Sequence, residues 1–342
     1  MYSEYMGKIV LFGELMLRLK PFGKERFFQS PSFNAVFGGS EANVAVSLSK
    51  FEKEVRFVTA LPDNPIGQAA LSSLRYYGVE TFAVKKEGRM GLYFLESGAC
   101  QRPSNVIYDR DNSVFSLTKP VEYDWDEIFS DCDWLHISGV TPAISENTAL
   151  SAKRAFEEAK KRGIKISLDL NYRKKLWKWG KDAGSVMREL SSYADLLIAN
   201  EEDVQNCLNI PLENKNTPSE SYRLLCKNVK KQFPDVEYVA VTFRHSVSAD
   251  INYWTCFLDG KEGFYESSRY EIQNIVERVG AGDAFAAGLI YALSSDFSES
   301  QALDFAAASG CLKHSIHGDF NLATREEVLA LAKGNGSGRI LR

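Results

Sequence analysis

Short apolar runs alternate with amphipathic segments along most of the chain. The runs at 8–14, 55–61, 134–138, 164–168, 194–199 and 236–242 predict buried strands, and a further pair is predicted at 253–258 and 263–267. Apolar residues at helical spacing predict helices over 41–51, 65–77, 147–162, 186–193, after residue 200, from residue 283 and over 299–314. Buried strands that alternate with helices are typical of a parallel sheet covered on both faces.

Two segments, 15–37 and 89–118, interrupt this alternation. The first alternates apolar and basic residues and is then rich in aromatics, and the second contains strand-like stretches at 91–96, 105–110 and 113–117 separated by Gly, Pro and Asn. We expect one small mixed β-sheet, inserted twice into an α/β body made of 7–14, 38–88 and 119–333. A lid over a cleft is the economical interpretation, and a homo-oligomer contact through the same strands is compatible with it. The glycine-rich end, 334–342, predicts a flexible tail.

Composition and charge narrow the classes of partner. The 342 residues carry 41 basic and 45 acidic side chains, a net charge of −4, so there is no basic surplus to bind nucleic acid or an anionic membrane. The first residues resemble neither a signal peptide nor a membrane span. Six scattered cysteines without a Cys-x-x-Cys pair predict reduced thiols and a cytoplasmic protein. His314 and His317 lack a neighbouring cysteine, so we expect no protein-held metal.

The stretch from Val279 to Gly288 carries the most chemistry. Gly280 and Gly282 precede Asp283, and an apolar helical run follows at once. Glycine allows close backbone approach to a ligand, and the free N–H groups of a helix start bind anions, most often phosphate. Asp283 is then either the N-cap of the helix or a base that accepts a proton from an attacking hydroxyl. Its ordinary pKa of about 4 means that it accepts the proton only as phosphoryl transfer proceeds.

Polar residues also gather where the predicted strands end. They are Glu14, the stretch from Asp169 to Arg173, the stretch from Asn200 to Asp203, and the stretch from Thr242 to Arg244. Because ligands bind outside the carboxyl ends of parallel strands, these positions predict a polar, anion-binding cleft. The chain has no Gly-x-x-x-x-Gly-Lys-[Ser/Thr] loop, and no Gly-x-Gly-x-x-Gly follows the first strand. P-loop enzymes and dinucleotide-dependent dehydrogenases are therefore disfavoured.

The stretch Val279–Gly288 resembles the C-terminal motif of the pfkB, or ribokinase-like, carbohydrate kinases, and Gly38-Gly39-Ser-Glu-Ala-Asn43 resembles their N-terminal motif. Further stretches, at 13–16, 102–110, 138–142, 169–177 and 318–321, are similar to 2-keto-3-deoxygluconate kinases. The likeness runs in order from about residue 8 to 332. It implies a doubly wound, mostly parallel α/β sheet with a β-sheet lid, as the alternation of elements indicates independently.

The resemblance also implies roles for residues of the phosphate side. Asp283 is expected to be the general base, and Gly280, Ala281 and Gly282 form the anion hole for the transferred group. Asn200 and Asp203 are expected to orient the Mg²⁺ of ATP through water, although the family commonly has Glu at the second position. The nucleotide is expected at Thr242, Arg244, Gly280 and Gly282, with Arg244 where a glycine is frequent. Glu277 stands where an Asp commonly binds a monovalent cation such as K⁺.

The sugar side is predicted partly from the residues themselves. An arginine fork binds a carboxylate bidentately, which a neutral sugar does not require, so Arg110 and Arg173 suggest an acidic sugar. Two surface arginines without such a role are the alternative. By resemblance, Gly38, Gly39 and Asn43 contact sugar hydroxyls together with Asp283, and Tyr93 and Tyr108 contact the sugar; otherwise these tyrosines would be lid-core aromatics.

Together these features predict an ATP-dependent kinase that phosphorylates the terminal hydroxyl of 2-keto-3-deoxygluconate. A pfkB kinase for a neutral keto sugar such as fructose is the first alternative. A non-catalytic sugar or nucleotide sensor on the same fold is the second, and Asp283 argues against it because a sensor needs no base.

Overall fold

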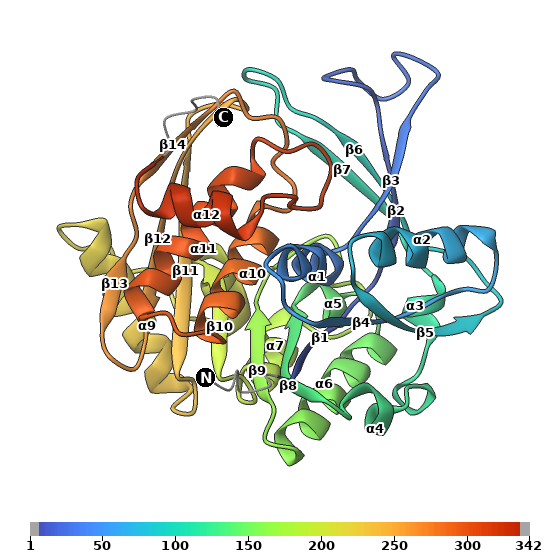
Figure 1. Ribbon diagram of the computed structural model, residues 1–342, viewed down its shortest axis with the longest axis horizontal. Helices are drawn as coiled ribbons and strands as arrows, with labels where there is room; N and C mark the ends of the chain where they lie inside the picture. Colours follow the sequence, from blue (N-terminus) through green and yellow to red (C-terminus); the bar gives the residue numbers. More distant parts are fainter. Residues whose placement is uncertain (1–6, 336–342) are drawn as a thin grey trace.

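The computed structural model describes residues 7–335 of the chain, and its centre is a ten-stranded sheet with helices on both faces (Figure 1). The strands are β1 (Lys8–Phe12), β4 (Val55–Pro62), β5 (Glu80–Lys86), β8 (Cys132–Ser138), β9 (Lys165–Asp169), β10 (Leu196–Asn200), β11 (Tyr238–Ser246), β12 (Ile251–Asp259), β13 (Phe264–Glu266) and β14 (Tyr270–Gln273). Their order is β13-β12-β11-β10-β9-β8-β1-β4-β5, with β14 paired to β12. All neighbours between β11 and β5 in this order pair in parallel, whereas β12 pairs antiparallel with β11, β13 and β14. The predicted mostly parallel sheet is therefore confirmed.

A separate hydrophobic core lies on each face of this sheet. Along β1, Ile9 and Leu11 point into one core and Val10 and Phe12 into the other, because successive side chains of a strand leave on opposite faces. Both faces are buried, so the strand is apolar from Ile9 to Phe12. The first core is covered by α1 (Ser40–Lys50), α2 (Pro65–Tyr76), α10 (Ala281–Leu293), α11 (Glu299–Lys313) and α12 (Arg325–Ala332).

A second set of helices covers the second core. They are α3 (Val114–Leu117), α4 (Trp125–Ile128), α6 (Glu146–Lys161), α7 (Ala183–Ser191) and α9 (Pro218–Gln232), with the π-helical turn η2 (Val204–Leu208). Three further short elements complete the body: η1 (Pro120–Glu122), α5 (Val140–Ala143) and α8 (Glu201–Asp203). The doubly wound arrangement therefore follows from helices that bury apolar stripes against both faces of one sheet.

The two interrupting segments form a second sheet that rises from the body (Figure 1). Its strands are β2 (Met16–Lys20), β3 (Asn34–Gly38), β6 (Leu92–Glu96) and β7 (Asn105–Asp109), in the order β3-β2-β6-β7. The β2–β6 pair is parallel and the outer pairs are antiparallel, so the predicted small mixed sheet is confirmed. We call this sheet, with its connecting loops, the lid.

The prediction of a strand at 113–117 is wrong. Ser113 instead caps the short helix α3, since its hydroxyl accepts a hydrogen bond from the Ser116 N–H at 3.2 Å. Val114 and Phe115 are buried in the second core of the body and do not belong to the lid sheet. A short apolar run does not itself distinguish strand from helix, and burial against the body decided the outcome here.

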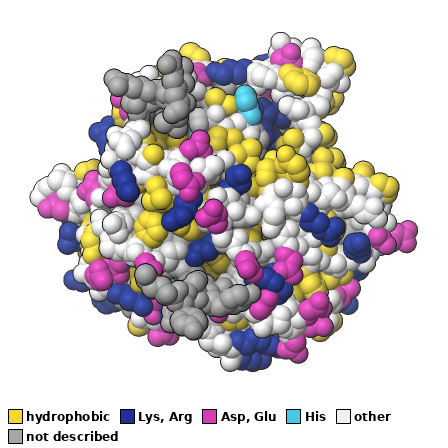
Figure 2. Space-filling view, in the orientation of Figure 1, with side chains coloured by type: hydrophobic (Ala, Val, Ile, Leu, Met, Phe, Trp, Pro, Cys, Tyr) yellow, Lys and Arg dark blue, Asp and Glu magenta, His cyan; other side chains and the backbone are white. Residues whose placement is uncertain are grey.

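Within residues 7–335, no helix has the length and apolarity needed to cross a membrane. Figure 2 shows Lys and Arg interspersed with Asp and Glu over the face in view, without a broad stripe of one sign. All six cysteines are free thiols. The predicted flexible tail lies, from residue 336 onward, outside the described residues.

Candidate active site

The helix start at Gly280 forms a backbone cradle. Gly280 is the N-cap of α10 and has a φ of 86°, a left-handed conformation that favours glycine. A Cβ at this position would lie 2.2 Å from the carbonyl oxygen of Asp319, whereas a Cβ at Gly282 would meet open space. The first N–H groups of the helix have no intrahelical acceptor, so the turn is built to accept an anion.

Asp283 is not the N-cap that one interpretation of the sequence proposed. It is the third residue of α10, and its two carboxylate oxygens accept hydrogen bonds from Ser40 Oγ and Asn43 Nδ2, each at 2.7 Å. Asn171 Nδ2 in turn donates to Ser40 Oγ at 3.1 Å. The carboxylate is thus held by side chains that follow the Gly-Gly motif, which leaves backbone capping to Gly280.

Burial changes the proton affinity expected for Asp283. Its pKa rises to about 6, because burial disfavours the charged form more than the hydrogen bonds from Asn43 and Ser40 favour it. The sequence suggested the ordinary value near 4, and the burial was not visible there. At neutral pH the group is mostly ionised, and it is a better proton acceptor than an ordinary aspartate.

The Gly-Gly motif permits a close approach of three segments. A Cβ on Gly39 would lie 2.1 Å from the carbonyl oxygen of Glu14, and one on Gly38 would lie 2.4 Å from Oδ2 of Asp319. A side chain at Gly39 would push α1 away from the segment that follows β1, and a side chain at Gly38 would displace Asp319. The two glycines therefore place Ser40 and Asn43 against Asp283.

One cavity of about 780 Å³ joins the lid, the strand ends and the start of α10. It is large enough for more than one small ligand, since typical ligand pockets measure 300–1,000 Å³. Most predicted site residues line it: Gly39, Asn43, Tyr93, Tyr108, Arg110, Arg173, Asn200, Asp203, Thr242, Arg244, Gly280, Gly282 and Asp283. Gly38, Ala281 and Glu277 do not line it, and neither does Glu14. Three of the four polar strand ends predicted from the sequence thus converge on the cavity, whereas Glu14 pairs with Arg110 and Ser113 at the base of the lid.

Asn200 and Asp203 hold each other at the end of β10. Asn200 Oδ1 accepts from the Asp203 N–H at 2.8 Å, and Asp203 Oδ2 accepts from the Asn200 N–H at 3.2 Å. Asp203 Oδ1 also accepts from the Tyr172 N–H at 2.9 Å. Burial raises the pKa of Asp203 to about 6, although the nearby Arg173 opposes the rise. Both residues therefore have structural partners, and the carboxylate keeps lone pairs that can accept from a metal-bound water.

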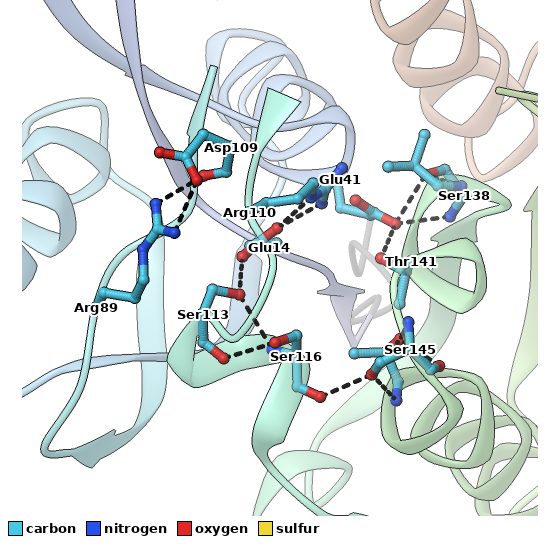
Figure 3. A network of polar contacts seen from close by, with 12 residues as sticks. Glu14, Glu41, Arg89, Asp109, Arg110, Ser113, Ser116, Ser138, Thr141 and Ser145 are labelled. Carbon is cyan, nitrogen blue, oxygen red and sulfur yellow. Dashed lines mark hydrogen bonds and ion pairs between the residues drawn. The ribbon is translucent and has the colours of Figure 1, made fainter. Parts of the chain in front are cut away.

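The cations of the cavity fall into two kinds. Arg173 is exposed to the cavity, and the hydrogen bond described for its guanidinium goes from Nη1 to its neighbour's carbonyl, Tyr172 O, at 2.9 Å. Within residues 7–335, no salt bridge joins Arg173 or Arg244 to a carboxylate. Arg110 is different: it is buried, with Nη2 at 2.5 Å and Nε at 2.7 Å from Oε2 of Glu14 (Figure 3). Its charge is already balanced, and only Nη1 has no partner among the described residues.

The tyrosines predicted to touch the sugar have different surroundings. Tyr93 is buried and donates its hydroxyl hydrogen bond to Asp319, whereas Tyr108 is half-buried on β7 beside it. The two ring centroids lie 6.3 Å apart, and Arg110 lies 5.7 Å from the ring of Tyr108. Both rings line the cavity, so lid packing and ligand contact are compatible roles.

Glu277 already has two protein cations beside it. Arg18 Nη2 lies 2.6 Å and Lys20 Nζ 2.9 Å from Oε2 of Glu277, and Arg18 also pairs with Asp319. Burial raises the pKa of Glu277, but these two cations outweigh it and keep the pKa below its ordinary value. The network joins lid strand β2 to the loop before the anion hole.

The sequence did not single out several residues that the structure places in the site. Ser40 donates a hydrogen bond to Asp283, Asn171 donates one to Ser40, and Arg278 lines the same cavity. Ser40 follows the two glycines of the Gly-Gly motif directly, and Asn171 lies inside the polar strand-end stretch 169–173, so the sequence carries a signal for both. For Arg278 the sequence carries no signal beyond its position two residues before Gly280.

No group of three or more His, Cys, Asp or Glu side chains within residues 7–335 could itself hold a metal ion. Asn200 and Asp203, with Glu201 and Glu202 on the same rim, offer oxygens of the kind that Mg²⁺ accepts through water. The residues present therefore fit a metal that enters with a phosphate ligand.

Comparison with known proteins places this geometry among sugar kinases. Residues 6–324 match the family described as pfkB family carbohydrate kinase. A 2-dehydro-3-deoxygluconokinase structure from Thermotoga maritima superposes with a TM-score of 0.92 at 43% identity, covering 96% of this chain and 100% of that one. The 2-dehydro-3-deoxygalactonokinase of Haloferax volcanii is 32% identical over 97% of this chain and 98% of its own length. The 2-dehydro-3-deoxygluconokinase of Thermoproteus tenax is 24% identical over 93% and 91%.

Proposed function

The chain belongs to the pfkB family of carbohydrate kinases, and we propose that it transfers the γ-phosphoryl group of ATP to the terminal hydroxyl of 2-keto-3-deoxygluconate. The observation that carries this proposal is one cavity holding a buried carboxylate, Asp283, at a backbone anion hole and an unpaired guanidinium, Arg173. The first supports phosphoryl transfer, and the second supports an acidic sugar. The named relatives act on sugar acids of this chemistry, which also supports the choice.

The residues around the reacting groups have separate tasks in this proposal. Asn43 and Ser40 orient the carboxylate of Asp283, which accepts the proton of the sugar hydroxyl as the phosphoryl group moves. The N–H groups at Gly280, Ala281 and Gly282 face the transferred phosphoryl oxygens and stabilise the charge that develops on them. Because an aspartate is a weak base, positioning and charge neutralisation supply most of the rate enhancement.

The nucleotide is proposed to lie along Asn200, Asp203, Thr242 and Arg244, with Mg²⁺ held by its phosphates and by waters on the first two residues. Mg²⁺ supplies charge neutralisation on the phosphate oxygens when it is bound. The sugar is proposed to lie between Gly39, Asn43 and the lid tyrosines. Arg173 attracts its carboxylate, and Arg110, neutralised by Glu14, contributes a single hydrogen bond through Nη1.

A bound K⁺ is not required in this proposal. Arg18 and Lys20 already neutralise Glu277, the position at which the resemblance suggested a monovalent cation. We therefore expect the same activity in KCl and in choline chloride. Activation by K⁺ would contradict this expectation.

Association through the lid is part of the same proposal. Register and alternation place Leu17, Leu19, Phe37, Leu92, Phe94 and Ile107 on the lid face that points away from the cavity. These side chains are half-buried or exposed, with Ile107 49% exposed. An apolar sheet face of this kind suits contact with a second copy of the chain. Free cysteines and the use of ATP and Mg²⁺ support a cytoplasmic location.

The test is the identity of the product. Incubation with 2-keto-3-deoxygluconate, ATP and Mg²⁺ should yield ADP and a sugar phosphate whose phosphorus couples to the terminal carbon in NMR. A neutral keto sugar such as fructose should give little product under the same conditions. A preference for fructose would favour the first alternative, and binding of sugar and ATP without turnover would favour the sensor.

A further inference from the structure

Arg278 lies between the ion-pair network and the anion hole. It follows Glu277, precedes Gly280 by two residues and lines the same cavity. Its Nε donates to Ala249 O at 3.1 Å, and its Nη2 donates to Ser248 O and, at 3.0 Å, to Asn252 Oδ1. The guanidinium is therefore anchored to the turn between β11 and β12, which we call the 246–250 turn.

The charge of Arg278 is not neutralised by these contacts. Its partners are two carbonyl oxygens and one amide oxygen, and no salt bridge to a carboxylate is described for it within residues 7–335. A guanidinium has five N–H donors, and Nη1 has no partner among the described residues. A half-buried cation without a directly paired carboxylate among the described residues gains from a bound anion. Burial and the nearby Arg244 lower the pKa of Arg278, and the carboxylate of Asp250 only partly opposes them, so two cations share one part of the cavity.

The tip of the lid docks on the turn that anchors Arg278. The Ala249 N–H donates to Cys100 O at 2.8 Å, and the Cys100 N–H donates to Asp250 Oδ2 at 3.0 Å. Lys24, from the other lid segment, lies 2.5 Å from Asp250 Oδ1. Figure 1 shows the β6–β7 hairpin arching from the lid toward the ends of β11 and β12. Both lid segments therefore reach the 246–250 turn.

We propose that Arg278 binds the polyphosphate of the nucleotide and that docking of the lid on the 246–250 turn positions its guanidinium. Sugar binding that closes the lid then tightens nucleotide binding, because the same turn holds both. The inference rests on the proposed nucleotide site. It adds a residue that discriminates a triphosphate from a monophosphate, since AMP shares the base and ribose but has fewer charges to pair with Arg278.

The first experiment is calorimetric binding of ATP, ADP and AMP to wild-type protein, Arg278→Gln and the control Arg269→Gln. Arg269 is exposed, and the contact described for its guanidinium is the ring of Tyr253 at 4.2 Å. In Arg278→Gln we expect ATP affinity to fall by at least tenfold and AMP affinity by less than threefold, with the control unchanged. Arg278→Lys should recover part of the ATP affinity. An unchanged ratio of ATP to AMP affinity in Arg278→Gln would overturn the assignment.

The second experiment tests the link to the lid with Asp250→Ala, which removes two lid contacts and leaves the described hydrogen bonds of Arg278 in place. The measured quantity is the ratio of dissociation constants of a non-hydrolysable ATP analogue without and with the sugar that the enzyme phosphorylates, because ATP itself would be consumed when both are bound. The wild-type ratio should exceed one, and it should fall toward one in Asp250→Ala and in Arg278→Gln. In the double variant the ratio should be no lower than in Arg278→Gln alone. A wild-type ratio retained by Asp250→Ala would overturn the positioning role. Failure of the wild-type protein to bind ATP would refute the proposed function itself, which is a different result.

Discussion

Replacing Arg173 by Met tests whether the site selects an acid. Arg173 lies in the open cavity, and its described hydrogen bond goes to a neighbouring carbonyl, so its removal leaves no buried partner unpaired. Met keeps much of the apolar stem and removes the charge. Arg110 would be a poorer choice, because its loss would leave the carboxylate of Glu14 buried and unpaired.

The size of the effect follows from the exposure of Arg173. A charge-assisted hydrogen bond contributes about 1.5–3 kcal/mol, and solvent screening at an exposed group keeps the value toward the lower end. Taking about 1.5–2 kcal/mol, at about 1.4 kcal/mol per factor of ten, kcat/KM for 2-keto-3-deoxygluconate should fall roughly 10- to 30-fold. Fructose has no carboxylate, so its already low kcat/KM should change by less than about threefold.

The assay couples ADP release to NADH oxidation and compares wild type, Arg173→Met and the control Lys174→Met with both sugars. Lys174 is the adjacent exposed cation and does not line the cavity, so its removal should leave both sugars unaffected. Equal losses on the acid and on fructose would show that Arg173 supports the nucleotide or the fold. The same loss in Lys174→Met would show that the effect comes from the total charge of the loop and not from Arg173 itself.

Three further predictions concern the base and the lid. Asp283→Asn should lower kcat by roughly two or more orders of magnitude while calorimetric ATP binding survives, because the amide cannot accept the proton; wild-type turnover would exclude Asp283 as the base. The pKa of Asp283, raised to about 6, means that the reactive carboxylate is lost as the pH falls, so kcat should decline below about pH 6 and level off above pH 7; a profile that is flat from pH 5 to 8 in rate-limiting chemistry would contradict this. Hydrogen exchange in residues 15–37 and 89–110 should slow when sugar is added, since both segments contact the cavity or the 246–250 turn; slowing elsewhere with no change there would make the lid a static oligomer contact.

The main sheet was predictable because its strands are buried on both faces. The strands β1, β4 and β8 are mostly apolar and buried at nearly every position, and parallel pairing in a doubly wound fold is the arrangement that buries such strands on both faces. The sequence analysis did not predict the edge strand β5, since ETFAVKK has one neighbouring strand, none of its residues is fully buried, and its charged residues conceal the apolar ones. It did not predict the strand β14 or the helix α12 at the periphery either, because few of their residues are buried.

The site residues were predictable where the residues that act together are neighbours in the sequence. Gly280, Gly282 and Asp283 are three neighbours whose types suffice to suggest an anion hole beside a carboxylate. The partners that set their properties come from distant segments: Asn43 lies 240 residues from Asp283, and Glu14 lies 96 residues from Arg110. The neutralised state of Arg110, the ion pairs of Glu277 and the raised pKa of Asp283 all depend on such pairs. A single sequence therefore identifies the functional side chains, but which of them form ion pairs is seen only in the folded structure.

The most direct test of the account is the wild-type ratio of kcat/KM for 2-keto-3-deoxygluconate to that for fructose, measured at saturating ATP and Mg²⁺ over 0.05–0.5 M salt. A cavity with an unpaired Arg173 and a buried base at an anion hole predicts a ratio of at least about 100 at low salt, falling as salt screens the exposed guanidinium. A ratio near one, or a preference for fructose at any salt concentration, would contradict the assignment of an acidic sugar.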